Sequence, residues 1–216
     1  MGRKAENNSN TNKLLPSKPA DTVTSVLILQ HPQEPDKELG TAALARRNLK
    51  NSKLKTGLSW PNLEKAWGEK CDKENWLVLY LGSAKLPAMR KDNKAELIFV
   101  DRRNNLFDDE KNIRSLKDFL QAKKRGIIVL DGTWSQAKTI WWRNAWLNKL
   151  KRAVILPPRP SLYGKLRKEP RKESISTIEA IAYSLEILEA NSAIKENLLN
   201  HFRELLLRYK TKADFD

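Results

Sequence analysis

The residue best placed to do acid–base chemistry in this sequence is Asp131, a carboxylate that stands between an apolar run and a helix start. The run 127–130 predicts a strand that is buried on both faces. After the turn at Gly132, Thr133 stands three residues before Gln136, which is the spacing of a helix capping box. Ligands of open α/β sheets bind beyond the carboxyl ends of the strands. The pattern therefore predicts a functional carboxylate, although an aspartate before a helix is also a common cap or turn residue.

His31 and Glu34 form a second polar group, and they follow the strand predicted at 23–29. Pro32 ends that strand, so both side chains are expected on a loop at its carboxyl end. Two such ligands without a third at metal spacing do not predict a metal site. Thr41 begins the next predicted helix, either as its cap or as a hydroxyl that faces a ligand.

Two further segments could approach a ligand. Gly82 and Ser83 end the apolar strand predicted at 76–81, and glycine at a strand end lets a ligand come close to the backbone. Ser176 and Glu179 have capping-box spacing, and a helix N-terminus offers free N–H groups to an anion. Helix initiation alone explains that second pattern equally well.

The elements that must position these groups alternate along the chain. Strands are predicted at 23–29, 54–58, 76–81, 97–100, 127–130 and 154–156, and helices at 40–47, from 59, and at 113–125, 137–150, 177–190 and 193–210. Apolar strands that alternate with helices favour an α/β fold with a mostly parallel sheet and flanking helices. We expect one domain over residues 21–216 and a disordered polar tail over residues 1–20.

The charge of the chain points to a polyanionic partner. Its net charge is +15, which suits RNA, DNA or an anionic membrane, or a generally basic surface. The segment 138–172 holds eleven Lys and Arg residues and one acid, Glu169, as expected of a track for phosphates. One cysteine, Cys71, excludes a disulfide framework within the chain. Without a membrane-length apolar run or a secretion-signal core, we expect a soluble cytoplasmic protein that binds no membrane.

The helix predicted at 137–150 has apolar residues nearly all the way round. Trp142 and Trp146 are four residues apart, so we expect them to stack on one face of that helix. Such a helix is buried on all sides or covers a second interface. That interface could be a dimer contact or an aromatic platform for an unstacked base.

Four motifs, in order, resemble those of the DTW-domain family. They are H-P-x-E at 31–34, D-x-T-W at 131–134, S-x-Y with basic residues and a proline at 161–170, and S-T-x-E-A at 176–180. The resemblance covers about residues 25–190. Gly40 stands where the family commonly has Asn, and Gly164 where it commonly has Arg. Many members also carry an N-terminal zinc-binding cysteine cluster, which this sequence lacks, so the cluster is dispensable or RNA docks differently here.

Members of this family are tRNA-uridine aminocarboxypropyltransferases. The resemblance implies transfer of the 3-amino-3-carboxypropyl group of S-adenosylmethionine to N3 of a tRNA uridine, which forms acp3U and releases methylthioadenosine. It also implies a SPOUT-like fold with a C-terminal trefoil knot, similar to that of the ribosomal-RNA aminocarboxypropyltransferases; knots are rare. The partner would be tRNA, no metal is expected, and the protein could be a monomer or a homodimer.

The resemblance also implies roles for individual residues. Asp131 is expected to be the catalytic base, or to orient the uridine or to counter the sulfonium charge. The expected cofactor-binding residues are Tyr80, Leu81, Gly82, Ser83, Leu130, Gly132, Thr133, Trp134, Leu156, Pro157, Pro158, Ser176 and Thr177. The expected tRNA-binding residues are His31, Glu34, Thr41, Arg159, Tyr163, Lys165, Arg167 and Lys168. The alternatives are a SPOUT-like RNA methyltransferase and a non-catalytic RNA-binding module.

Overall fold

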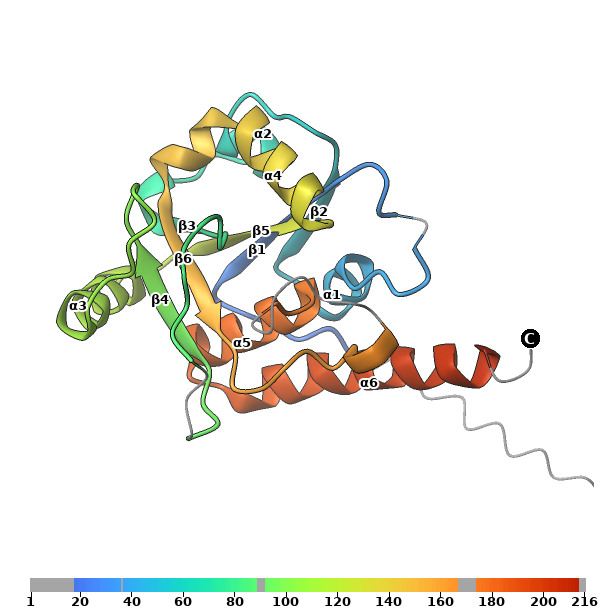
Figure 1. Cartoon of the computed structure of the whole chain (residues 1–216). Helices are drawn as coiled ribbons and strands as arrows, with labels where there is room; N and C mark the ends of the chain where they lie inside the picture. Colours follow the sequence, from blue (N-terminus) through green and yellow to red (C-terminus); the bar gives the residue numbers. More distant parts are fainter. Residues whose placement is uncertain (1–17, 36, 89–91, 167–173, 214–216) are drawn as a thin grey trace, which may run out of the picture.

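A six-stranded sheet runs through the centre of the molecule (Figure 1). The computed structural model describes residues 18–35, 37–88, 92–166 and 174–213. The strands are β1 Ser25–Gln30, β2 Ser52–Thr56, β3 Trp76–Leu79, β4 Glu96–Val100, β5 Gly126–Asp131 and β6 Lys151–Leu156, in the order β2-β1-β5-β3-β6-β4. All neighbouring pairs are parallel except β4 with β6, which is antiparallel. The predicted α/β class with a mostly parallel sheet is confirmed.

Helices cover both faces of the sheet. The α-helices are α1 Ala42–Asn48, α2 Leu63–Trp67, α3 Asp109–Leu120, α4 Trp134–Arg143, α5 Thr177–Glu189 and α6 Ser192–Ala213; the 3₁₀ turns are η1 Lys73–Asn75, η2 Ala145–Lys149 and η3 Gly164–Leu166. Helices α1, α5 and α6 lie on one face, α2 and α4 lie on the other, and α3 lies beside β4 (Figure 1). None of the described helices is long and apolar enough to cross a bilayer.

The apolar runs of the strands supply a core on each face. Val26 and Ile28 pack with α1, α5 and α6, whereas Leu27 and Leu29 pack with α2 and α4. All four side chains are fully buried. Alternate residues of one strand point to opposite faces, so a sheet with helices on both faces needs continuous apolar strands.

Strand β5 lies between β1 and β3, and its last residue is Asp131. The parallel register pairs Asp131 with Gln30, the last residue of β1. At the other end of β5, a Cβ added to Gly126 would lie 2.5 Å from the Trp76 ring, so only glycine fits under that indole. The sheet therefore brings the carboxyl ends of β1 and β5 together, and Asp131 lies at the carboxyl end of β5.

The helix predicted at 137–150 is in fact two elements. Helix α4 ends at Arg143, and Asn144 adopts a non-helical backbone before η2 begins. The side-chain amide of Asn144 donates to the carbonyls of Ile140 and Leu58, which stabilises the break. The predicted stacking of Trp142 on Trp146 is therefore wrong, because the two indoles do not share one helix face. The Trp146 indole N–H donates to the Trp60 carbonyl, and Trp142 is 68% exposed.

Candidate functional site

A cavity of about 460 Å³ opens at the carboxyl ends of β3, β5 and β6. It is lined by residues 79–81 and 86, 129–135 and 137, 154 and 155, and 174–177 and 180. Helices α4 and α5 both begin at this cavity, one from each face of the sheet (Figure 1). This is the position at which open parallel sheets bind their ligands.

Asp131 lines the cavity and is 7% exposed. The Gln30 amide donates to Oδ2 of Asp131 over 2.9 Å, and the Thr177 hydroxyl donates to Oδ1 over 2.5 Å. The Oε1 atom of Gln30 accepts from the Thr56 hydroxyl, which fixes the orientation of the amide. These two donors orient the Asp131 carboxylate in the wall of the cavity.

The turn after Asp131 requires glycine at position 132, and a capped helix follows it. Gly132 has a φ of +152°, and an added Cβ would lie 2.8 Å from the Gln136 Cβ. The Thr133 side chain and the Gln136 side chain each accept from the other's backbone N–H, so the predicted capping box is confirmed. Thr133 is therefore the cap of α4, and the Asp131 carboxylate lines the cavity instead.

Helix α5 begins with a second predicted capping box, between Ser176 and Glu179, which is also confirmed. The Glu179 carboxylate is fully buried and accepts from the hydroxyl and N–H of Ser176, the Ser161 hydroxyl and the Leu162 N–H. It therefore ties the loop after β6 to the first turn of α5. That turn carries Thr177, whose hydroxyl donates to Asp131.

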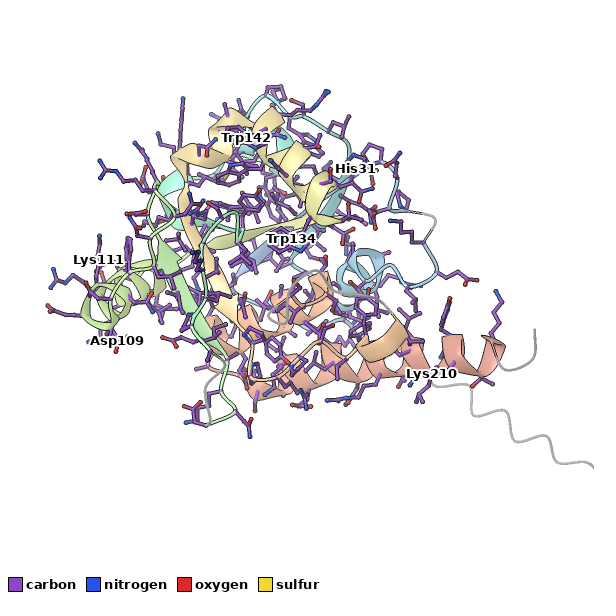
Figure 2. All side chains as sticks on the ribbon, in the orientation of Figure 1. His31, Asp109, Lys111, Trp134, Trp142 and Lys210 are labelled. Atoms are coloured by element: carbon purple, nitrogen blue, oxygen red, sulfur yellow. The ribbon has the colours of Figure 1, made fainter. Side chains whose placement is uncertain are left out.

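Aromatic side chains form part of the cavity wall. The Tyr80 ring stacks on Trp141 with the ring centroids 4.5 Å apart. Burial raises the pKa of the Tyr80 phenol above its usual value of 10, so this hydroxyl is neutral at physiological pH. Trp134 is the first residue of α4 and lies at the opposite end of that helix from Trp142 (Figure 2).

The structure gathers most of the expected cofactor-binding residues. Tyr80, Leu81, Leu130, Gly132, Thr133, Trp134, Ser176 and Thr177 line the cavity together with Asp131. Gly82, Ser83, Leu156, Pro157 and Pro158 do not line it. Leu156 instead belongs to a small core with Ala84 and Ile98.

Ten lining residues were missed by the sequence analysis. They are Leu79, Leu86, Val129, Ser135, Ala137, Val154, Ile155, Ser174, Ile175 and Ala180. Most are apolar, and an apolar residue in a sequence pattern can belong equally well to a pocket wall or to the hydrophobic core. Ser174 and Ile175 directly precede the S-T-x-E-A motif, Ala180 ends it, and Ser135 directly follows D-x-T-W, so proximity to a motif was the signal available for these four.

The expected tRNA-binding residues are dispersed. His31 lies beside the site, because its N–H donates to the Asp131 carbonyl over 3.0 Å. Arg159 is exposed. The Lys165 side chain, Arg167 and Lys168 lie outside the described residues.

Three of the expected tRNA-binding residues are buried and bonded to other parts of the protein: Glu34, Thr41 and Tyr163. Glu34 is 4% exposed and forms an ion pair with Lys37 over 2.5 Å. Thr41 makes no side-chain cap on α1; its hydroxyl instead accepts from the Ile178 N–H in the first turn of α5.

Tyr163 is 2% exposed; its hydroxyl donates to the Leu39 carbonyl, and its ring packs against Phe202. Buried side chains with such partners are not available to a macromolecule. Across the described ranges, no three His, Cys, Asp or Glu side chains are close enough to hold a metal ion.

Comparisons with known proteins agree with this geometry. The chain is 31% identical over 194 residues to tRNA-uridine aminocarboxypropyltransferase 2 of Macaca fascicularis, and this match covers 88% of the chain and 56% of the relative. Proteins of the same name from Mus musculus and Drosophila melanogaster are 29% and 24% identical, over 88% of the chain and 56% and 66% of their own lengths. The chain thus spans about half to two thirds of the length of these relatives.

No solved structure is significantly similar to the chain. The DTW domain matches residues 8–210, which is nearly the full sequence. The D-G-T-W motif within that match forms the turn that carries Asp131 and the capped start of α4. The chain therefore belongs to the DTW domain family.

Proposed function

We propose that this protein transfers the 3-amino-3-carboxypropyl group of S-adenosylmethionine to N3 of a tRNA uridine. The observation that carries the proposal is the buried Asp131 carboxylate, which Gln30 and Thr177 orient in a cavity at the carboxyl edge of the sheet. The names of the relatives, tRNA-uridine aminocarboxypropyltransferases, support this choice of reaction.

The cavity suits the proposed donor. Its volume of about 460 Å³ lies within the range of small-molecule sites, roughly 300–1,000 Å³. Leu79, Leu86 and Ile155 offer apolar surface to an adenosine. Asp131 is the one charged side chain among the described lining residues, and its negative charge complements a sulfonium.

The chemistry follows from these groups. When bound, S-adenosylmethionine supplies a carbon, next to its sulfonium, that a nucleophile can attack. The nucleophile, uridine N3, must lose a proton, and we assign the acceptance of that proton to Asp131. A positioned base of this kind typically contributes about 10²–10⁴-fold to the rate. Because N3 is on the Watson–Crick edge, the uridine must be unpaired or extruded before it can reach Asp131.

Helix α4 is proposed as part of the tRNA surface. Trp142 is 68% exposed, and it is flanked on the same helix by the exposed side chains of Lys138 and Arg143. Eight residues separate it from Trp134 at the cavity, a distance of about 12 Å along a helix. A nucleotide near the target uridine could therefore stack on Trp142 while the cations contact phosphates.

Not every cation of the segment 138–172 is available to RNA. Arg152 is half-buried, and its guanidinium donates to the Asp101 carbonyl and to the Asn104 side chain. Arg152 thus stabilises the loop after β4 and is removed from the proposed phosphate track.

The finer features of the fold belong to the same proposal. The family resemblance supports a SPOUT-like arrangement with a C-terminal trefoil knot, one catalytic domain over residues 21–216 and a cytoplasmic location. An experimental structure in which the chain after β6 passes through a loop would support the knot, and an unthreaded chain would refute it.

The decisive experiment analyses both products. Incubation of the protein with unmodified tRNA and S-adenosylmethionine should yield an aminocarboxypropyl-modified uridine by mass spectrometry, together with methylthioadenosine. A methylated nucleoside with S-adenosylhomocysteine would instead identify a methyltransferase. Binding of tRNA without any affinity for the donor would identify a non-catalytic RNA-binding module.

A further inference from the structure

Ser174 has a buried hydroxyl without a partner at the cavity. The residue is 8% exposed, it lines the cavity, and its Oγ atom forms no hydrogen bond with the described residues of the chain. Buried polar atoms are nearly always hydrogen-bonded, so an unpartnered one at a cavity wall calls for a ligand. The mechanism described above does not use this hydroxyl.

The first turn of α5 adds a second donor group beside Ser174, which stands two residues before the cap Ser176. The Ile178 N–H donates to Thr41, and the Glu179 N–H donates to Ser176. Within the described part of the chain, the Thr177 N–H has no hydrogen-bond partner. The free N–H groups and the dipole at the start of this 13-residue helix favour an anion.

Among the described residues of the cavity wall there is no Lys, Arg or His, so the donors that these residues offer to an anion are neutral. We propose that Ser174 and the first turn of α5 bind the carboxylate of the aminocarboxypropyl group of the donor. This inference rests on the proposed function, and it identifies how the site would recognise the group that is transferred.

The distance between the two ends of that group agrees with the assignment. Four bonds of about 1.5 Å join the sulfur to the carboxylate carbon, which gives a reach of about 5 Å. Asp131 and the start of α5 are joined by the hydrogen bond from Thr177, so both ends of the group can be held at once. With both ends held, the carbon chain, and not the methyl group, has a fixed position beside Asp131.

The N-terminus of α4 is the competing anion site. Its residue Ser135 also lines the cavity, but the Ser135 side chain is exposed. Water can satisfy an exposed serine, so the buried hydroxyl of Ser174 favours α5.

Calorimetry with two ligands tests the proposal on the full chain. Methylthioadenosine lacks the aminocarboxypropyl group, so its affinity does not depend on a carboxylate site. Ser174→Ala should weaken S-adenosylmethionine binding by about tenfold, as expected for a lost hydrogen bond to a charged group. Methylthioadenosine should bind this variant and the parent protein equally well, which also shows that the cavity is still folded. Ser135→Ala tests the competing site at α4, and the matched control Ser115→Ala, on α3 and outside the cavity lining, should bind both ligands like the parent.

Two results would overturn the carboxylate site and leave the proposed function standing. One is an S174A variant that binds S-adenosylmethionine as the parent does, or that loses both ligands to the same degree. The other is a selective loss of S-adenosylmethionine in S135A, which would move the carboxylate to α4. A parent protein that binds neither ligand would refute the proposed donor itself.

Discussion

The structure decides between two roles that the sequence allows for Asp131. A carboxylate before a helix could have been its cap, but Thr133 caps α4. Both oxygens of Asp131 instead receive donors from β1 and from α5. The side chain is therefore both oriented and in contact with the cavity, as a catalytic carboxylate needs to be.

Asp131→Asn should lower the transfer rate by about 10²–10⁴-fold, because an amide cannot accept the uridine proton. The variant should also lose about 1–3 kcal/mol of stability, since its amide N–H₂ meets the donors that the carboxylate now accepts. Single-turnover kinetics and thermal melting measure the two effects. Unchanged transfer with reduced stability would show that Asp131 is only structural. A parallel fall in affinity for the donor would assign it to the sulfonium charge.

Glu179→Gln should destabilise the protein by about 1–3 kcal/mol. The fully buried Glu179 carboxylate accepts four hydrogen bonds, from Ser161, Leu162 and Ser176. A Gln amide would direct its own N–H₂ at the donors of one of the two oxygens. Urea denaturation gives the free energy of unfolding. The control is Glu186→Gln on the same helix, where a partly exposed ion pair with Lys195 is lost and a change below about 1 kcal/mol is expected. Equal losses in the two variants would contradict this role of Glu179.

Among the elements, α4 joins the proposed chemistry to the proposed RNA surface. Its first turn lines the cavity, and its last turn carries the exposed Trp142 (Figure 2). The break at Asn144 ends the helix there. A continuous helix to residue 150, as predicted, would have placed Trp146 on the same surface.

Trp142→Ala should weaken tRNA binding by about tenfold or more, because a stacked base contributes roughly 1–3 kcal/mol. The free energy of unfolding should change little, since the side chain is 68% exposed. Fluorescence titration measures the affinity. Leu207→Ala is the control, because Leu207 is 63% exposed on α6 and is not next to the cavity. Unchanged tRNA affinity would remove the platform, and a change of mass in light scattering would show that Trp142 is a dimer contact.

At the scale of the whole molecule, charge is concentrated rather than spread. The segment 138–172 carries eleven of the 41 Lys and Arg residues and one of the 26 acids. It extends from α4 through η2 and β6 to η3, and its last residues lie outside the described ranges. The proposed phosphate contacts are therefore the exposed cations of this segment, among them Lys138, Arg143 and Arg159.

Neutralising Arg159, Lys165, Arg167 and Lys168 should weaken tRNA binding and flatten its dependence on salt. Each lost contact in a single-stranded region should reduce the slope of log K against log salt by about 0.7. Binding measured at several salt concentrations gives that slope. A control variant neutralises three exposed lysines, Lys117, Lys123 and Lys124, around the end of α3, on the other side of the molecule from η3 (Figure 1). An unchanged slope in the first variant would exclude the segment from the interface.

The sequence by itself determined what depends on near neighbours. Five of the six strands follow from apolar runs, because a strand buried on both faces is apolar at nearly every position. The exception is β2, Ser52–Thr56, which reads S-K-L-K-T and is mostly half-buried. Both capping boxes follow from a spacing of three residues, because their hydrogen bonds close within one turn. Asp131 could be placed at the carboxyl end of a strand for the same reason.

The tertiary structure alone decided which distant groups meet. Gln30 reaches Asp131 across 101 residues of sequence, and the Asn144 amide reaches Leu58 across 86. Glu34 and Tyr163, which a motif reading places on the RNA, are 4% and 2% exposed, and Phe202 of α6 packs against the Tyr163 ring. The unpartnered hydroxyl of Ser174 likewise exists only as a relation between a loop and a cavity wall. Such contacts depend on the spatial order of the strands in the sheet and on which face each helix covers. No local sequence pattern predicts either.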